Sequence, residues 1–561
     1  MRAEPWEPRL RYHAWVLRNM PTDADLVRER LSVRRWSDPP LLSVITPVYN
    51  TPPEMLRRMV RSIQRQSYPH WELCLIDDGS PLHWTAPYLA SLAARDPRIH
   101  FQRRACNGGI VAASNEALAL ASGVFVVLVD DDDELDPRAL YAVAERIRER
   151  PDTDVIYSDF DVIGTDGVRR DPMLAPAWSP ELLLSIPYIA HLAAYRRELV
   201  LRIGGFRPEY EGSQDYDLAL RVTTLTDRIV HIPRVLYHWR TWSRSAAGNP
   251  EAKPYAYAAG LRAITEHLRQ HPFEGRREEG HTLGCHSARF PIKGDPLVSL
   301  IVPMWTRNGT PALRSIASLQ ASLTAIAQHT AYPHRECLVA GPREQEAMLF
   351  DGLDRDVIES LRLRFVACDA DVAGDGDAAL AANGAAAEAS GAHLLFLGDD
   401  LEPLDPGWLS AMLEFSQQPG IGAVGAKIFL REGLIWHAGL VLPRANPCLV
   451  RLDDLITRNY SAVSAACLMT RRDLFDTVNG FAAAADAGCS DADYCLRLRP
   501  HGQRIVLTPH ARLRHLADPP AEADADRRQI FRTRWSPSLP FDPFYNRSYR
   551  QDAAWYVLAL D

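Results

Sequence analysis

Residues 125–136 read FVVLVDDDDELD, an apolar run that ends in four consecutive aspartates. Residues 394–405 read LLFLGDDLEPLD, so an apolar run with an acidic end returns later in the chain. A short apolar run without helical spacing predicts a buried strand. Four more pairs of similar segments follow in the same order: 42–50 and 298–306, 67–76 and 331–340, 203–220 and 478–498, and 235–239 and 512–516. We therefore predict two homologous domains.

Within each copy, strands are predicted to alternate with helices. In the first copy the predicted strands span 43–48, 72–76 and 124–129, and the predicted helices span 54–65 and 111–121. This alternation predicts an α/β fold, with a mostly parallel, Rossmann-like sheet covered by helices on both faces. The predicted boundaries are an N-terminal extension at 1–40, a first domain at 41–250, a linker at 251–295, a second domain at 296–520 and a C-terminal extension at 521–561.

The composition excludes several classes of protein. Of 561 residues, 47% are hydrophobic and 24% are charged, which is typical of a globular chain and not of a disordered one. The net charge of −8 argues against nucleic acid as a partner, because phosphate binding needs excess positive charge. Since no apolar run could cross a bilayer and the N-terminus has no apolar signal core, we expect a cytoplasmic protein. Nine cysteines without a CxxC pair fit free thiols in a reducing compartment.

Two acidic groups follow strands in the first copy. Asp77 and Asp78 could accept hydrogen bonds from a nucleobase or a ribose, or they could simply form a turn. Asp130 and Asp132 are two residues apart on an extended segment, so their side chains share a face. Carboxylates in this arrangement suit Mg²⁺ or Mn²⁺ completed by phosphate oxygens, and the alternative is a solvated acidic loop.

Three further positions are candidates for the same cleft. Asp215 stands at a predicted helix start, where it could act as a general base or as a helix cap. His238 lies among aromatic residues and could be a metal ligand or an interface histidine. Residues 107–109 (Asn-Gly-Gly) precede a helix, where glycines allow close approach of a ligand and the helix N-terminus favours an anion.

Taken together, these segments resemble the family 2 glycosyltransferases, which have the GT-A fold. The resemblance is carried by SVITPVYN (43–50), DDGS (77–80), NGG and SN (107–115), the DxD of 130–132, GSQD (212–215) and YHWR (237–240). It covers nearly all of both halves. The residues PEAKPYA (250–256) and FDPFYN (541–546) are similar to those of the tandem-domain bacterial enzymes of O-antigen, lipopolysaccharide and other surface polysaccharide assembly.

The resemblance implies a role for each matched residue. The base pocket would be lined by Thr46, Pro47 and Tyr49, the base or ribose would be bound by Asp77 or Asp78, and the donor would be approached by Asn107 and Gly108. Asp130 would contact the ribose or metal, Asp132 would hold the metal, and His238 would complete the metal shell or touch the diphosphate. Asp215 would deprotonate the acceptor. A divalent ion stabilises the leaving diphosphate, and one base with one direct displacement inverts the anomeric centre.

The expected activity is therefore metal-dependent, inverting transfer of a hexosyl or deoxyhexosyl group from a nucleoside diphosphate sugar. The resemblance implies a glycan acceptor, free or lipid-linked. It also implies contact with other polysaccharide-assembly enzymes and peripheral association with the inner membrane. A sugar-phosphate nucleotidyltransferase is a rival, but it should carry a glycine-rich, basic loop where residues 48–51 read VYNT. A non-catalytic glycan-binding scaffold is the third alternative, and the intact acidic residues of the first copy argue against it.

The second copy retains only part of this set. Asp77 and Asp78 become Gly341 and Pro342, which cannot replace a base-binding carboxylate. The retained residues are Asp400 and His515 as metal ligands and Asp491 as the base, whereas Asp130 becomes Gly398 and Asn107 becomes Asp375. The second domain is then either a transferase of weak or different specificity or a module that positions the acceptor.

Overall fold

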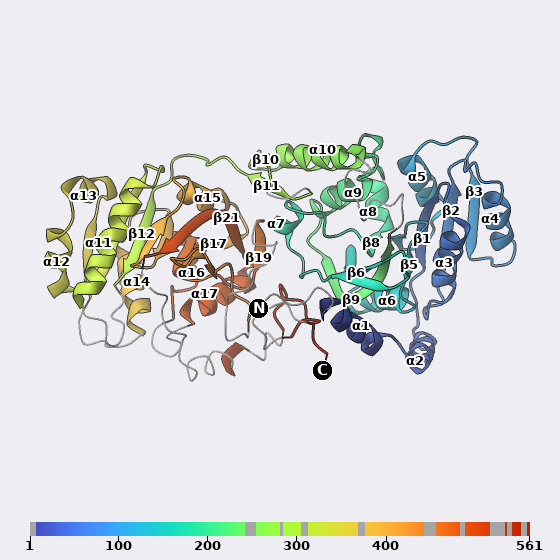
Figure 1. The fold of residues 1–561 in the computed structure, drawn as a ribbon, viewed down its shortest axis with the longest axis horizontal. Helices are drawn as coiled ribbons and strands as arrows, with labels where there is room; N and C mark the ends of the chain where they lie inside the picture. The colour runs from blue at the N-terminus through green and yellow to red at the C-terminus, as the bar shows by residue number, and fades with distance from the viewer. Residues whose placement is uncertain are drawn as a thin grey trace.

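The computed structural model describes residues 7–241, 254–280, 284–304, 312–368, 376–442, 456–482, 489–516, 533–535, 541–550 and 558–560. The chain forms two α/β domains that lie side by side, with the first at the right of Figure 1 and the second at the left. Residue 375, the predicted counterpart of Asn107, lies outside the described residues.

The first domain is built on a nine-stranded sheet with the order β3-β2-β1-β4-β8-β6-β9-β5, and β7 is added on β6. The strands are β1 (Leu42–Val48), β2 (Trp71–Asp77), β3 (Ile99–Arg103), β4 (Phe125–Leu128), β5 (Glu134–Leu135), β6 (Val155–Ile163), β7 (Arg169–Met173), β8 (Ala193–Arg196) and β9 (Ile229–Arg240). β3, β2, β1 and β4 run parallel, as do β6 and β9. β8 is antiparallel to both β4 and β6, so it joins two parallel halves.

Helices cover both faces of this sheet. They are α3 (Pro53–Gln64), α4 (Thr85–Ala93), α5 (Ile110–Leu120), α6 (Ala139–Glu149), α7 (Pro180–Leu183), α8 (Arg197–Arg202), the 3-10 turn η1 (Pro208–Tyr210) and α9 (Gln214–Thr223). Apolar residues of α3, α4 and α6 pack on one face with Val44 and Leu73. Residues of α5, α8 and α9 pack on the other face with Ile45 and Cys74. Alternate residues of each strand thus enter opposite cores, as the pleat requires.

The second domain repeats this topology, with the order β14-β13-β12-β15-β20-β17-β21-β16. Its strands are β12 (Val298–Pro303), β13 (Arg335–Pro342), β14 (Arg364–Cys368), β15 (His393–Leu397), β16 (Leu401–Pro403), β17 (Ile421–Phe429), β18 (Ile435–His437), β19 (Arg458–Tyr460), β20 (Cys467–Arg471) and β21 (Arg504–His515). Its helices are α11 (Ala312–Gln328), α12 (Glu346–Asp351), α13 (Arg355–Leu361), α14 (Gly376–Glu388), α15 (Trp408–Ser416), α16 (Arg472–Thr477) and α17 (Ser490–Leu498), with 3-10 turns η4 (Arg343–Gln345) and η6 (Arg499–His501). The prediction of two tandem Rossmann-like domains is confirmed.

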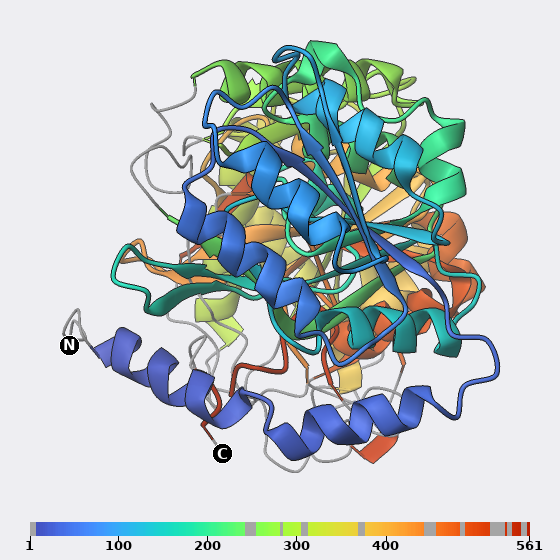
Figure 2. The ribbon, with the colours of Figure 1, turned by 90° about the vertical axis from the view of Figure 1, so that its right-hand side faces the viewer.

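The segments outside the two sheets are also structured. The N-terminal extension forms α1 (Glu7–Asn19) and α2 (Asp23–Val33), which cross the lower edge of the molecule in Figure 2. The predicted linker contains α10 (Pro254–Gln270), which packs against α9, and a hairpin of β10 (Arg276–Glu279) and β11 (His286–Arg289). Within the described residues, no helix is both long and apolar enough to cross a membrane.

The C-terminal extension contacts both domains. The Asp542 carboxylate accepts a hydrogen bond from the Leu442 backbone N–H (2.7 Å) and another from the Ser461 hydroxyl (2.8 Å) in the second domain. Four residues later, the Asn546 side-chain amide donates to Asp159 Oδ2 of β6 in the first domain at 2.7 Å. Both anchors are buried, so this segment ties the two domains together.

Candidate functional site

The candidate site lies at the carboxyl ends of β1, β2 and β4, where the predicted residues of the first copy gather. Asp77 ends β2 and is fully buried. Its Oδ1 accepts the Ser80 backbone N–H at 2.9 Å, and its Oδ2 forms an ion pair with Arg103 Nε at 3.3 Å. Asp77 Oδ2 has no hydrogen-bond partner within the described chain, and neither does the buried Thr46 Oγ1 of β1. Thr46 Oγ1 thus has no partner in the described chain, and Asp77 Oδ2 has an ion pair but no hydrogen bond, so a ligand can still donate to or accept from this edge.

Asp78 organises the loop before α5. Its two carboxylate oxygens accept the backbone N–H groups of Gly108 and Gly109, each at 2.9 Å, and the carboxylate is also paired with Arg104. Gly109 has a positive φ of 91°, which favours glycine. The structure thus brings Asp78 and the 107–109 loop together, as the sequence predicted.

The N-terminus of α5 does not point at an open anion site. The Glu211 carboxylate accepts the N–H groups of Ile110 (2.8 Å) and Val111 (3.2 Å). An acidic side chain of the protein therefore already occupies the position that an anion would take at this helix. The expectation that this helix start favours an external anion is not supported by this arrangement.

The loop after β1 is held to the acidic cluster by Asp131, a residue that the sequence reasoning did not single out. Asp131 Oδ2 accepts the Tyr49 backbone N–H at 2.9 Å and the Thr51 hydroxyl. This anchoring leaves the Tyr49 side chain 50% exposed at the edge of the site. Pro47 of β1 lies beside Ile76 of the neighbouring parallel strand β2.

The four aspartates at the end of β4 divide into two pairs. Asp131 and Asp133 are turned into the protein, and Asp133 accepts the Tyr237 hydroxyl at 2.6 Å and the Arg240 backbone N–H at 2.7 Å. Burial, followed by the charge of Asp132, raises the pKa of Asp131 to about 8 and the pKa of Asp133 well above its ordinary value. The negative charge of Asp130 and Asp132 therefore acts on the whole cluster.

Asp215 and His191 complete the site from the other side. Asp215 lies in the first turn of α9. Burial raises its pKa, the positive charge of His191 lowers it, and the negative charge of Asp130 raises it again. The pKa of His191 is lowered by burial and raised by Asp215 and Asp132. These couplings bring Asp130, Asp132, Asp215 and His191 into one electrostatic cluster.

His191 is the second residue that sequence reasoning missed. Its ring stacks on Tyr237, with ring centroids 4.5 Å apart, and it also contacts Phe160 and Trp239. A single histidine in an apolar stretch gives no local signal of a functional site. Only the fold brings the loop before β8 to the acidic tip of β4, which is the run of aspartates at 130–133.

His238 has different surroundings. Its Nδ1 lies 2.6 Å from Asp161 Oδ1, and Asp161 also accepts hydrogen bonds from the Tyr12 hydroxyl and from Arg169. Neighbours in a strand point to opposite faces, so β9 presents His238 away from Tyr237, whose hydroxyl reaches Asp133. This placement does not favour the predicted role of His238 as a metal ligand beside Asp132.

A divalent cation still fits the acidic tip. In the described part of the chain, no group of three or more His, Cys, Asp or Glu side chains has the arrangement of a metal site. However, Asp130 and Asp132 supply hard oxygen ligands, and their charges already raise the pKa values of Asp131 and Asp133. A cation held there, together with phosphate oxygens, would relieve this repulsion.

The second domain keeps part of the same site. His515 Nδ1 lies 3.0 Å from Asp400 Oδ1, so this predicted pair is brought together. Asp491 is half-buried at the start of α17, accepts the Ala465 backbone N–H at 3.1 Å, and has a pKa that is raised by loss of solvation. Gly341 and Pro342 end β13 where the first domain has Asp77 and Asp78, so these two positions of the second domain carry no carboxylate.

Comparison with known proteins gives consistent results. Residues 43–207 match the model of the family "Glycosyl transferase family 2". The chain is 36% identical over 582 residues to the uncharacterized protein y4gI of Sinorhizobium fredii, covering 97% of this chain and 62% of that protein. It is 33% identical over 569 residues to the O-antigen biosynthesis protein RfbC of Myxococcus xanthus, covering 97% of this chain and 43% of that protein. The chain thus spans less than two thirds of either relative.

Among solved structures, the chain is similar to residues 1–349 of S. aureus TarS in complex with UDP. The TM-score is 0.34 at 21% identity, and the similarity covers 41% of this chain and 66% of that one.

Proposed function

We propose that the first domain, whose residues 43–207 match the family model, transfers a sugar from a nucleoside diphosphate sugar to a glycan. The observation that carries the proposal is the cluster of Asp130, Asp132, Asp215 and His191 at the end of β4. It joins two carboxylates that would hold a cation for the diphosphate to a candidate base in one site.

The nucleoside would bind at the adjacent edge of the sheet. Buried polar atoms without partners are rare in proteins and are often satisfied by a ligand. Thr46 Oγ1 and Asp77 Oδ2 are such atoms, and they suit hydrogen bonds from a base or a ribose. The half-exposed Tyr49 ring offers a face on which a base can stack. Asp78, Asn107 and Gly108 would shape the loop that closes this side.

Asp130 and Asp132 would hold Mg²⁺ or Mn²⁺. When bound, such an ion stabilises the negative charge that develops on the leaving diphosphate. Asp215 would accept the proton of the attacking sugar hydroxyl. Because burial raises its pKa from the ordinary range of a carboxylic acid, Asp215 is a stronger base than an exposed aspartate. With this one base, direct displacement would invert the anomeric centre, and a hexosyl or deoxyhexosyl group would move in one step.

The second domain would have an altered or accessory role. It retains Asp400, His515 and Asp491, which argues for a site that still binds a ligand. It has no carboxylate at the positions of Asp77 and Asp78, so a donor would be held differently or not at all. We therefore assign the main transfer activity to the first domain.

The acceptor would be a growing bacterial surface polysaccharide of the O-antigen type, either free or linked to a lipid. The support is the similarity to the O-antigen biosynthesis protein RfbC of M. xanthus, which extends along 97% of this chain. A lipid-linked acceptor would place the protein at the inner membrane as a peripheral, cytoplasmic enzyme beside other assembly enzymes.

The test is nucleoside diphosphate release from a panel of donor sugars, with and without Mn²⁺. A transferase hydrolyses the donor slowly and releases the nucleoside diphosphate faster when a glycan acceptor is present. A nucleotidyltransferase instead releases pyrophosphate from a nucleoside triphosphate. A scaffold releases neither product. Asp132→Ala should abolish metal-dependent donor binding in calorimetry, whereas Asp152→Ala, an exposed aspartate on another loop, should not change it. Normal donor binding by Asp132→Ala would reject the assigned metal site.

A further inference from the structure

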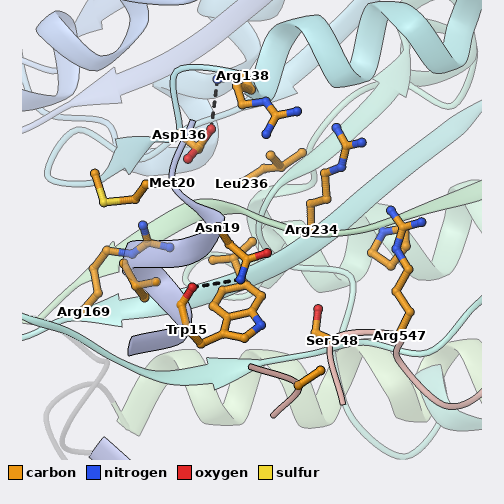
Figure 3. Close-up of a pocket in the computed structure, with 14 residues that line it drawn as sticks. Trp15, Asn19, Met20, Asp136, Arg138, Arg169, Arg234, Leu236, Arg547 and Ser548 are labelled. Carbon is orange, nitrogen blue, oxygen red and sulfur yellow. Dashed lines mark hydrogen bonds between the residues drawn. The ribbon is translucent and has the colours of Figure 1, made fainter. Parts of the chain in front are cut away.

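A hollow of about 340 Å³ is lined by residues of α1, β9 and the C-terminal segment. Figure 3 shows the guanidinium groups of Arg138, Arg234 and Arg547 on one side of this hollow. The lining also includes the carboxylate of Asp136 and the side chains of Trp15 and Val16 from α1. The hollow therefore combines several positive charges with an apolar surface.

The charges of these arginines are unevenly compensated. Arg138 forms an ion pair with Glu29 at 2.8 Å. In the described part of the chain, Arg234 and Arg547 have no ion pair. Burial, and then the like charges of Arg138 and Arg547, lower the pKa of Arg234. The protein thus holds a half-buried guanidinium beside two others, an arrangement that a bound anion would stabilise.

A second hollow of about 460 Å³ extends the first, because both are lined by Met20, Asp136 and Arg169. It adds three arginines of α3 and its C-terminal end, namely Arg58, Arg61 and Arg65. Glu54, Glu134, Asp136 and His238 also line this second hollow, so a lining of mixed charge that is rich in arginine continues from the C-terminal segment toward β5. Together the two hollows offer more volume than a single small ion needs.

We propose that the hollow around Arg234 is a second ligand site, for a molecule that carries a phosphate or diphosphate ester. Guanidinium groups bind phosphate oxygens in pairs of parallel hydrogen bonds. Trp15, Val16 and Leu236 would contact the carbon skeleton attached to the phosphate. This site does not depend on the transfer activity proposed above.

The surface beside the hollow favours a phosphate borne by a lipid over a soluble one. Leu10 and Leu17 of α1 are 60% and 62% exposed, and Met20 at its end is 53% exposed. Apolar side chains next to a cluster of arginines are typical of surfaces that contact a lipid headgroup and the chains below it. The alternative source, a soluble phosphate ester, would use the same arginines.

Calorimetric titration of the full chain with pyrophosphate, in EDTA, tests the site without a metal at Asp132. We expect one binding event, which Arg234→Gln and Arg547→Gln each weaken by roughly tenfold or more. Arg234→Lys should weaken it less, since it keeps the charge and loses only the paired geometry. Arg95→Gln, an exposed arginine after α4, is the matched control and should bind normally. Thermal unfolding would verify that each variant is folded.

Three results would overturn the proposal: no pyrophosphate binding by the unmodified protein, equal affinity in Arg234→Gln, or binding that only Asp132→Ala alters. Cosedimentation with phosphatidylcholine vesicles, with and without phosphatidic acid, identifies the source. Vesicle binding that needs phosphatidic acid and is lost in Arg234→Gln would assign the site to a lipid. Pyrophosphate binding without vesicle binding would assign it to a soluble phosphate ester.

Discussion

Asp215 is the single side chain on which the proposed chemistry depends most. It lies in the first turn of α9, its pKa is raised by burial, and it interacts with the charge of His191. Asp215→Asn keeps the shape and removes the proton acceptor, so we expect turnover to fall by roughly 10²- to 10⁴-fold. Donor affinity, measured by calorimetry, should stay near normal because the variant leaves Asp130 and Asp132 intact.

The equivalent substitution in the second domain shows which of the two sites accounts for the measured turnover. Asp491→Asn removes the equivalent carboxylate at the start of α17. If the second domain also turns over the same donor, the double variant will be slower than Asp215→Asn alone. Turnover by Asp215→Asn equal to that of the unmodified enzyme would remove Asp215 from the mechanism.

The sheet registers give a physical reason to expect the second domain to be less active than the first. β8 pairs with β4 so that Arg196 faces Phe125, and β20 pairs with β15 so that Arg471 faces His393. Counting back five residues from each arginine aligns His191 with Ala466. The second domain therefore lacks the histidine that interacts with the candidate base in the first.

At the scale of elements, the start of β6 depends on one carboxylate. Asp154 accepts hydrogen bonds from Arg196 Nε of β8 (2.8 Å) and, in the segment before β9, from Thr226 Oγ1 (2.6 Å) and Arg228 Nη2 (2.7 Å). Burial alone would raise the pKa of Asp154, but these hydrogen bonds outweigh it and lower the pKa below its ordinary value. Ionised Asp154 therefore stabilises the fold at neutral pH.

This linkage has a definite sign. Because the folded pKa is lower than the unfolded value of about 3.9, the stabilisation is present above pH 4 and is lost as the pH falls through the folded pKa. We expect Asp154→Asn to lower the free energy of unfolding by about 1–3 kcal/mol at pH 7. Denaturant unfolding should show this difference shrinking toward pH 3. Asp152→Asn, two residues earlier and exposed, is the control, and a pH-independent deficit in Asp154→Asn would contradict the argument.

The elements themselves could be predicted closely from the sequence. The strand expected at 43–48 is found at Leu42–Val48, and the helix expected at 54–65 is found at Pro53–Gln64. Short apolar runs and helical spacing are local signals, so they survive without knowledge of the fold. The antiparallel insertion of β8 between β4 and β6 could not be predicted, because strand order depends on contacts between distant segments.

The candidate site was predictable from the sequence only in part. Asp77 ends β2 and Asp130 follows β4, so both stand at the edge formed by the carboxyl ends of parallel strands, and Asp215 interacts with the charge of Asp130 from the start of α9. The roles of these residues stay predictions. The orientation of His238 was not predictable, since it depends on which face of β9 meets Asp161. The anchoring roles of Asp131 and Glu211 are equally invisible in sequence, because each carboxylate binds backbone N–H groups that only the folded loops bring near.

At the scale of the whole molecule, the two domains are joined by more than the connecting chain. The Ser185 hydroxyl, just after α7 in the first domain, donates a hydrogen bond to the Thr457 backbone carbonyl of the second domain at 3.0 Å. The C-terminal segment reaches Asp159 of the first domain through Asn546. Such contacts fix the position of the second domain beside the first, which is what a domain that positions an acceptor would require.

Glu181 of α7 is the centre of the polar contact between the domains. Its carboxylate accepts hydrogen bonds from Arg504 of β21 (2.9 Å) and Asn459 of β19 (2.6 Å), and it is buried. Glu181→Ala leaves both donors unsatisfied, so we expect the free energy of unfolding to fall by about 2 kcal/mol, less than for a fully buried pair because Arg504 retains contact with water. Calorimetric unfolding should show a lower and less cooperative transition. Glu198→Ala, on an exposed position of α8, should leave the transition unchanged. An equal transition in both variants would mean that the apolar contacts alone hold the domains together.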